Sequence, residues 1–143
     1  MMLSRKGLLA IAAVIDVALH GRGRPVSAKA LALRHSLPSR HLEPVLQALV
    51  RKGILKGVRG PRGGYELGRE RRRINADDIL RVAGAVESQE DATAGGSILL
   101  SDVVLPAMAQ AQRAFSTALS RITVEELARK AESLKELSTD PGP

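Results

Sequence analysis

Glycine and proline punctuate one eight-residue stretch too densely for the interior of a helix or strand. Residues 58–65 read Val-Arg-Gly-Pro-Arg-Gly-Gly-Tyr and lie between two short apolar runs. This pattern predicts a β-hairpin with a glycine-rich turn. Arg59 and Arg62 stand on the turn, and two guanidinium groups on a rigid loop suit phosphate or a narrow nucleic-acid groove. The alternative is an ordinary solvated turn.

Two helical patterns joined by a tight connection precede the hairpin. The first is short and follows Ser27, which can cap it. The second ends where Gly53 can supply the residue after the C-cap and has apolar residues at i, i+3, i+4 and i+7: Leu42, Val45, Leu46 and Leu49. Short helix, brief turn and second helix form the helix-turn-helix pattern. In that motif the N-terminal residues of the second helix reach base edges in the major groove.

The start of this second helix carries polar residues off its apolar face: Ser39, Arg40, His41 and Glu43. Two prolines leave the helix start open. Pro38 fits the first helical position, but the ring of Pro44 would meet the carbonyl of Arg40 in a helix that began at residue 38. Either the helix begins near Arg40 or its first turn is distorted.

A further helix is predicted near the N-terminus, capped by Ser4 and ended by the Gly-Arg-Gly-Arg-Pro run at residues 21–25. Arg5 and Lys6 fall in its first turn, where cations oppose the helix macrodipole. Exposed cations beside free backbone N–H groups suit a phosphate, although a tolerated solvated end is the alternative. The basic residues 68–73 are predicted to be a solvated connection, and residues 71–73 are candidate phosphate contacts.

The C-terminal part is predicted to hold three further helices. Asn75 can cap the first of them, residues 87–98 read as a mobile loop, and Pro106 should start or kink the long helix that follows. Thr123 and Glu126 form a capping box for the last helix. The long helix has an apolar side, on which the candidate dimer contacts are Leu100, Val104, Ala107, Met108, Ala111, Phe115, Ala118 and Ile122. The alternative is that this helix packs only on its own domain.

Charge divides the chain into two unlike parts. The formal net charge is +7, and residues 1–73 carry 16 Lys and Arg against 4 Asp and Glu, whereas residues 74–143 carry 6 against 11. Such segregation indicates that one part meets a polyanion, most simply nucleic acid. Aromatic residues make up only 1% of the chain, so aliphatic residues must build the core, which favours packed helices.

Several classes of protein are excluded or disfavoured by the sequence. The chain has no cysteine, so it has no disulfide, thiolate metal site or cysteine nucleophile. No apolar stretch is long enough to span a membrane and no signal-peptide pattern is present, which predicts a cytoplasmic protein. No nucleophile–base pair, metal set or phosphate-binding loop indicates an enzyme. His20, His35 and His41 lack metal-ligand spacing and are predicted to be surface or cap residues.

The predicted fold is mainly α with a small β-hairpin wing, a winged helix-turn-helix followed by a long dimerisation helix. The predicted divisions are 1–86 for the DNA-binding domain, 87–98 for the loop, 99–137 for the dimerisation helices and 138–143 for a disordered tail. The predicted DNA contacts are Ser4, Arg5, Lys6, Ser27, Pro38, Ser39, Arg40, His41, Glu43, Arg59, Gly60, Arg62, Gly63 and Tyr65.

Four short motifs are more specific to a protein family than the pattern of helices is. Leu-Ser-Arg-Lys-Gly at residues 3–7, His-Leu-Glu at 41–43, the octet at 58–65 and residues 74–79 resemble the Rrf-type bacterial transcription regulators, the family of IscR, NsrR and CymR. The resemblance spans residues 2–137. It implies a repressor that binds a palindromic operator as a homodimer, with Arg59 in the minor groove. It also implies that Glu43 accepts a hydrogen bond from a cytosine amino group.

One departure from this family concerns its sensor. Cluster-binding members place three cysteines after the fourth helix, whereas residues 87–105 of this chain contain none. The chain therefore resembles the cluster-free branch, which takes its input from protein partners or small molecules and needs no cofactor or metal. The predicted entry for such a signal is the seam near Val86 and residues 99–108. The alternative function is a protein-interaction adaptor with the same fold that senses a metabolic enzyme or small molecule.

Overall fold

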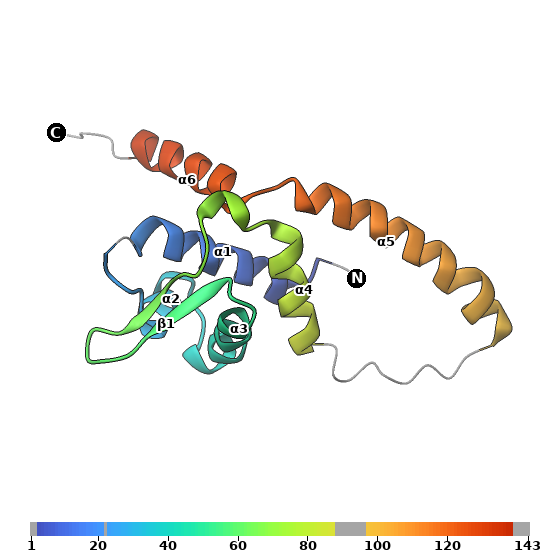
Figure 1. Cartoon of the computed structure of the whole chain (residues 1–143), viewed down its shortest axis with the longest axis horizontal. Helices are drawn as coiled ribbons and strands as arrows, with labels where there is room; N and C mark the ends of the chain where they lie inside the picture. Colours follow the sequence, from blue (N-terminus) through green and yellow to red (C-terminus); the bar gives the residue numbers. More distant parts are fainter. Residues whose placement is uncertain (1–2, 22, 88–96, 139–143) are drawn as a thin grey trace.

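The computed structural model describes residues 3–21, 23–87 and 97–138. It is mainly helical with one two-stranded antiparallel sheet, as the sequence predicts (Figure 1). The elements in chain order are α1 (Arg5–His20), α2 (Ala28–Arg34), α3 (Ser39–Arg51), β1 (Leu55–Val58), β2 (Gly64–Leu67), the 3₁₀ turn η1 (Arg71–Arg73), α4 (Ala76–Glu87), the π-helical segment η3 (Leu100–Val104), α5 (Leu105–Ser120) and α6 (Val124–Ser138).

An aliphatic core joins α1, α3, α4, the hairpin and the start of α6. Its largest fully buried side chains are Leu31, Leu46, Leu49, Ile54, Leu55, Ile74, Ile79, Val14, Val17 and Val124. Each such side chain contributes roughly 1.5–3 kcal/mol relative to exposure. The core forms because every helix that contributes to it repeats its apolar residues at helical spacing.

The start of α3 settles the question that the two prolines raise. Pro38 is the N-cap, the helix begins at Ser39, and Pro44 lies inside it. The N–H of His41 donates to the carbonyl of Pro38 at 3.0 Å, an i to i−3 bond that tightens the first turn. The helix therefore begins at Ser39, one residue before Arg40, with a 3₁₀-type bond in its first turn.

Both helices of the helix-turn-helix end in the same hydrogen-bonded cap. At the end of α3 the N–H of Ile54 donates to the carbonyl of Leu49 at 3.0 Å, and Gly53 has a φ of +76°, which is the Schellman geometry predicted for that glycine. At the end of α2 the N–H of Leu37 donates to the carbonyl of Ala32 at 2.9 Å. There Ser36 takes the left-handed position, with a φ of +53°.

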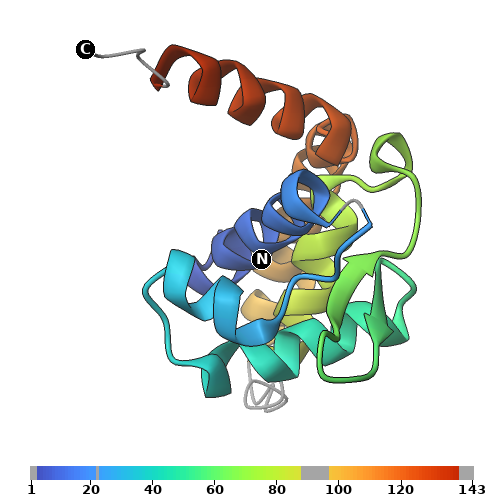
Figure 2. The same cartoon turned by 90° about the vertical axis from the view of Figure 1, so that its left-hand side faces the viewer.

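The hairpin is docked on the chain segment that precedes α2. Leu55 pairs with Leu67 and Val58 with Gly64, and β2 pairs further with Val26 through two hydrogen bonds between the backbones of Val26 and Tyr65, at 2.9 and 2.8 Å. In Figures 1 and 2 the hairpin, α2 and α3 lie together on one side of the molecule, away from α6.

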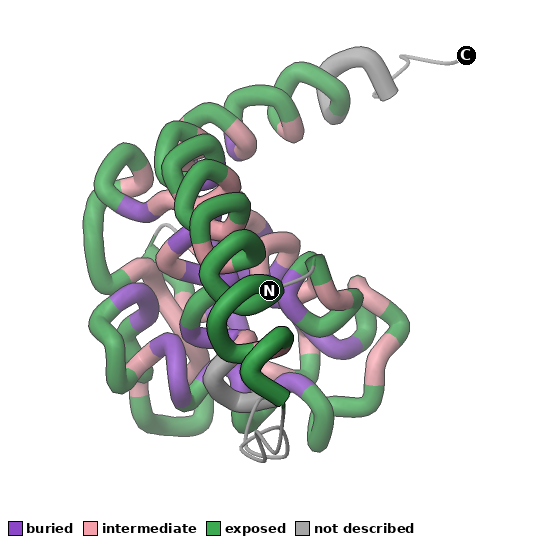
Figure 3. Tube along the Cα trace, turned by 90° about the vertical axis from the view of Figure 1, so that its right-hand side faces the viewer, coloured by how far each residue is buried: buried purple, intermediate pink, exposed green. Residues whose placement is uncertain are grey.

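The long C-terminal helix is continuous with η3, and Pro106 lies in its first turn. At that junction the N–H of Leu105 donates to the carbonyl of Leu100, five residues back. The π-helical widening relieves the clash that the proline ring would otherwise make with the preceding turn. Figure 3 shows that α5 is largely exposed along its length.

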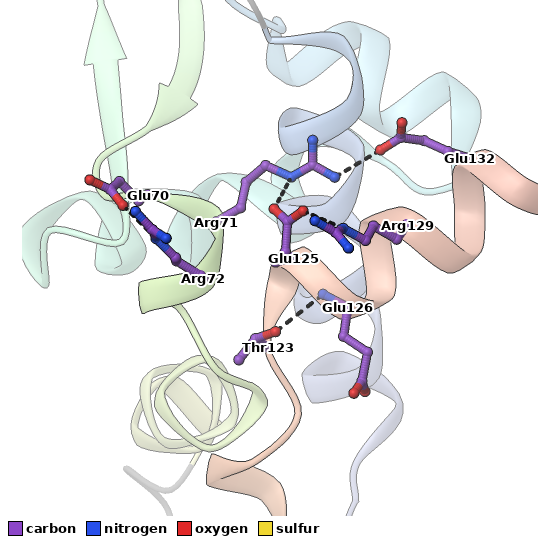
Figure 4. Close-up of polar contacts among 8 residues, drawn as sticks. All are labelled: Glu70, Arg71, Arg72, Thr123, Glu125, Glu126, Arg129 and Glu132. Carbon is purple, nitrogen blue, oxygen red and sulfur yellow. Dashed lines mark hydrogen bonds and ion pairs between the residues drawn. The ribbon is translucent and has the colours of Figure 1, made fainter.

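Helix α6 is anchored at its start to the chain segment that precedes α4. The N–H of Val124 donates to the carbonyl of Ile74, and the N–H of Ala76 donates to the carbonyl of Ile122, both at 2.8 Å. The Thr123 hydroxyl accepts from the N–H of Glu126 at 3.1 Å, which is one half of the predicted capping box, whereas the Glu126 carboxylate points away from Thr123 in Figure 4. The predicted loop lies mostly in residues 88–96 and the predicted tail mostly in 139–143, outside the described residues.

Two buried carboxylates join helices that are distant in sequence. Asp16 on α1 accepts two hydrogen bonds from Arg34, at 2.8 and 2.7 Å, and lies 3.0 Å from Nε2 of His35. Asp77 on α4 accepts from the Ser116 hydroxyl on α5 at 2.7 Å. Buried charges need partners of this kind, so these contacts fix the positions of α2 and α5.

Candidate DNA-binding surface

The N-terminal turn of α3 presents one polar face to solvent. Leu42, Val45 and Leu46 are buried in the core, which turns the opposite face outward. The exposed residues there are those predicted to contact bases, namely Pro38, Ser39, Arg40, His41 and Glu43.

The start of α1 lies beside this turn. Ser4 caps α1 by accepting from the N–H of Gly7 at 2.9 Å, as its sequence position predicts. Arg5 and Lys6 are exposed, and they line a small cavity of about 280 Å³ together with His41 of α3. The first turns of α1 and α3 therefore meet, and their cations share one surface.

The hairpin joins the same surface through Tyr65. Burial, followed by the negative charge of Glu43 on α3, raises the pKa of the Tyr65 phenol. A Cβ on Gly64 would lie 2.8 Å from the backbone nitrogen of Ser27 and 2.5 Å from the carbonyl oxygen of Val26. The absence of a side chain at Gly64 thus allows the hairpin to pack directly on the start of α2.

The turn of the hairpin carries the two predicted arginines. Arg59, Gly60 and Arg62 are exposed and Gly63 is half-buried, and the N–H of Gly63 donates to the carbonyl of Gly60 at 2.9 Å. This bond closes the turn into a compact loop with both guanidinium groups outside it.

Two of the predicted DNA contacts, Ser4 and Ser27, are helix N-caps. The hydroxyl of Ser27 accepts from the N–H of Ala30 at 3.0 Å and so caps α2, while Ser4 caps α1. Both hydroxyls are half-buried, so each stabilises the start of a helix at the edge of the surface.

The prediction that residues 71–73 form a solvated connection able to hold phosphate is wrong for Arg71. Its side chain is only 14% exposed, its Nε lies 3.2 Å from Glu125, and its Nη2 lies 2.8 Å from Glu132. Figure 4 shows that Glu125 also forms an ion pair with Arg129. The sequence could not reveal this network, because Glu125 and Glu132 lie more than fifty residues away along the chain.

The predicted dimer contacts fall into two groups. Val104, Ala107, Met108, Ala111 and Ala118 are exposed, and Leu100 is half-buried. Phe115 and Ile122 instead pack against the buried Leu80 and Leu119 of the same chain. Helix α5 therefore uses its C-terminal half to dock on α4 and leaves its N-terminal half open.

Comparison with known proteins agrees with this arrangement. The family model Rrf2, described as an iron-dependent transcriptional regulator, matches residues 3–130. The chain belongs to the Rrf2 family. It is 33% identical to the HTH-type transcriptional regulator IscR of Xenorhabdus nematophila over 142 residues, which cover 94% of this chain and 83% of that protein.

Solved structures of Rrf2 relatives share the fold. IscR of T. potens is 30% identical and superposes with a TM-score of 0.71, covering 94% of this chain and 90% of that one. CymR of B. subtilis, titled the global cysteine regulator, is 28% identical with a TM-score of 0.68, covering 91% and 98%. The protein is therefore a DNA-binding transcriptional regulator with a winged-helix fold, and its relatives are regulators rather than enzymes.

The description of the family as iron-dependent raises the question of a metal site in this member. The chain has no cysteine, and within residues 3–21, 23–87 and 97–138 no three His, Asp or Glu side chains are grouped so as to hold a metal ion. Iron–sulfur clusters are bound by thiolates. The donor set of this chain does not fit such a cluster.

None of the helices in the described ranges combines the length and apolarity needed to cross a membrane.

Proposed function

We propose that this Rrf2 protein is a repressor that binds a palindromic operator as a homodimer in the cytoplasm and works without an iron–sulfur cluster. The observation that carries the proposal is the convergence of three elements on one basic surface. The exposed first turn of α3 lies beside the start of α1, which carries Arg5 and Lys6, and the hairpin that carries Arg59 lies on the same side of the molecule as α3.

Each element has a distinct task in this proposal. Arg5 and Lys6 hold phosphates, which adds affinity without reading sequence. Glu43 accepts from the amino group of a cytosine in the major groove. Arg59 enters the adjacent minor groove, where a narrow A·T-rich segment concentrates negative potential.

The open half of the C-terminal helix supports the proposed homodimer. Large apolar side chains there are exposed, and Met108 is 57% exposed. The others on this segment are Ile98, Leu99, Val103, Val104 and Leu105. Exposed large apolar side chains gathered on one segment are typical of an interface, and a two-fold dimer would place half-site centres roughly one helical turn, about 34 Å, apart.

Without thiolates, the regulatory input is a protein partner or a small molecule. The entry predicted for it, near Val86 and residues 99–108, borders residues 88–96, which lie outside the described part of the chain. In this proposal, a protein effector or the second subunit binds the exposed segment from Ile98 to Met108.

The test of DNA reading is a binding-site selection from random duplexes, followed by single-base substitutions. Glu43→Ala is expected to relax preference at one position per half-site by roughly 1–3 kcal/mol. Glu126→Ala, which removes an exposed carboxylate on α6, is the control and should leave the preference unchanged. Failure to select any sequence would favour the adaptor function, and an equal loss on all bases would refute the role of Glu43.

The test of the dimer is sedimentation at micromolar concentration. Met108→Glu places a charge in the proposed interface and is expected to yield monomers, while Gln110→Glu, also exposed on α5, should leave the dimer intact. A wild-type protein that remains monomeric would contradict the proposal.

A further inference from the structure

The cavity between the first turns of α1 and α3 has an unusual combination of surfaces. Its interior is apolar, and its rim is cationic. The side chains that line it are Arg5, Lys6, Leu9, Ala10, Leu37, His41, Leu42 and Val45. Ala10, Leu42 and Val45 are buried, whereas Arg5, Lys6 and His41 are exposed, so the cavity opens to solvent on its charged side.

The size of the cavity limits what it can hold. Its volume is about 280 Å³, and an engineered apolar cavity of roughly 150 Å³ already accommodates benzene. Protein interiors are normally packed with few voids larger than a water molecule. The space therefore has room for a small organic molecule.

We propose that this cavity binds an aliphatic monocarboxylate, with the alkyl chain against Leu9, Leu42 and Val45 and the carboxylate at the rim near Arg5 and Lys6. An apolar interior favours an alkyl chain over a polar molecule, because it offers few partners for buried polar groups. Two cations at the opening favour an anionic head group over a neutral one.

The position of the cavity couples this ligand to DNA. This step rests on the proposed function, in which Arg5 and Lys6 hold phosphates and the first turn of α3 enters the major groove. A carboxylate at the rim neutralises the same cations and adds negative charge on the path of the DNA backbone. The ligand and the operator therefore bind antagonistically, and by linkage each weakens the other to the same extent.

The binding test needs no DNA. Straight-chain carboxylates from butanoate to decanoate are titrated into the purified protein and followed by calorimetry, with alcohols of equal length in parallel. Affinity is expected to rise about fourfold per added methylene, then to stop rising when the chain exceeds the cavity. The carboxylates are expected to bind more tightly than the alcohols. No binding by any carboxylate, or equal binding by the alcohols, overturns the proposal.

Substitutions locate the site. Leu9→Phe and Val45→Leu fill the cavity and are expected to shorten the longest chain that binds or to abolish binding, with folding checked by circular dichroism. Leu33→Phe is the control, because Leu33 is 73% exposed on α2 and does not line the cavity. Arg5→Gln with Lys6→Gln should lower carboxylate affinity several-fold and leave alcohol affinity unchanged. Binding that survives both filling variants places the ligand elsewhere and overturns the site.

A separate measurement tests the antagonism. The tightest carboxylate is added to a preformed operator complex, and the apparent operator affinity is expected to fall in proportion to ligand occupancy in wild type but not in Val45→Leu. Carboxylate binding that leaves operator affinity unchanged would overturn the coupling. If no operator is found at all, the proposed function fails while the titration still decides whether the cavity binds carboxylates.

Discussion

Ser36 is the one non-glycine residue with a positive φ among those the structure describes, at +53°. It lies in the turn between α2 and α3, where the left-handed conformation costs an L-residue roughly 1–2 kcal/mol. Ser36→Gly should remove this strain but add entropy to the unfolded chain, for a net gain of about 0.5–1 kcal/mol in urea unfolding. Ser133→Gly, at an exposed helical position on α6, should instead destabilise the protein. Equal losses in both variants would show that the turn is not strained.

Tyr65 is the only tyrosine, and there is no tryptophan, so its titration can be followed cleanly by ultraviolet absorbance. Burial and then the charge of Glu43 raise its pKa from the ordinary value of 10.0. Because the folded state favours the neutral phenol, its contribution to stability is complete below pH 10 and is lost as pH rises through the raised value. Glu43→Gln should lower the pKa and move that loss to lower pH. An unchanged titration would mean that the carboxylate is not near the phenol.

At the scale of elements, the wing depends on one close approach between backbones. A Cβ at residue 64 would lie 2.5 Å from the backbone of Val26, whereas a Cβ at Gly57 of the same hairpin meets nothing within 4 Å. Gly64→Ala should therefore cost about 1–3 kcal/mol and loosen the hairpin, with faster amide exchange at Tyr65. Gly57→Ala should be neutral or slightly stabilising. Equal effects of the two alanines would argue against direct packing of the hairpin on the start of α2.

The attachment of α6 to the rest of the molecule depends on the ion pairs of Arg71. Arg71→Gln removes both contacts to Glu125 and Glu132 and should cost about 1–2 kcal/mol, because the guanidinium is mostly buried while Glu132 is exposed and partly screened. Amide exchange in α6 should accelerate. Arg72→Gln is the matched control, since Arg72 is 78% exposed and its ion pair is with the exposed Glu70. It should leave the unfolding midpoint unchanged.

Local signals in the sequence were sufficient for the elements of the fold. Caps at Ser4, Ser27 and Asn75, the helical spacing of the leucines in α3 and the glycine pattern of the hairpin all depend on neighbours within a few residues. The Arg71 network, the buried Asp16 clamp and the cavity beside His41 depend on contacts between distant segments. A single sequence carries no periodicity that would reveal such contacts, so they could not be predicted.

The residues of the candidate DNA-binding surface were likewise predictable only where the signal was local in the sequence. The sequence identified the exposed cations and polar residues of α1, α3 and the wing, because charge and turn composition are local properties. It could not show that β2 pairs with Val26 or that Phe115 packs within its own chain. It also could not separate Arg71, which is held inside the molecule, from the exposed arginines beside it.

At the scale of the whole molecule, the segregation of charge predicts which residues set the salt dependence of DNA binding. Residues 1–73 carry 16 Lys and Arg against 4 Asp and Glu, and each phosphate contact that is lost should make the slope of log affinity against log salt less steep by roughly 0.9. In the proposed homodimer, Arg5→Gln combined with Lys6→Gln removes two contacts from each subunit and should therefore reduce the slope by about 3.6. Fluorescence anisotropy with an operator duplex between about 50 and 200 mM salt measures this.

The matched control for this experiment removes two cations from the other part of the chain. Arg113→Gln combined with Arg121→Gln lowers the net charge equally, and both residues are exposed on or directly after α5. If affinity followed net charge alone, the two double variants would change the slope alike. Because the release of counterions from the DNA depends on direct phosphate contacts, and long-range attraction is screened within about 8–10 Å near 0.1–0.15 M salt, only the Arg5 and Lys6 pair should change the slope. An equal change in both variants would refute the placement of DNA across the first turns of α1 and α3.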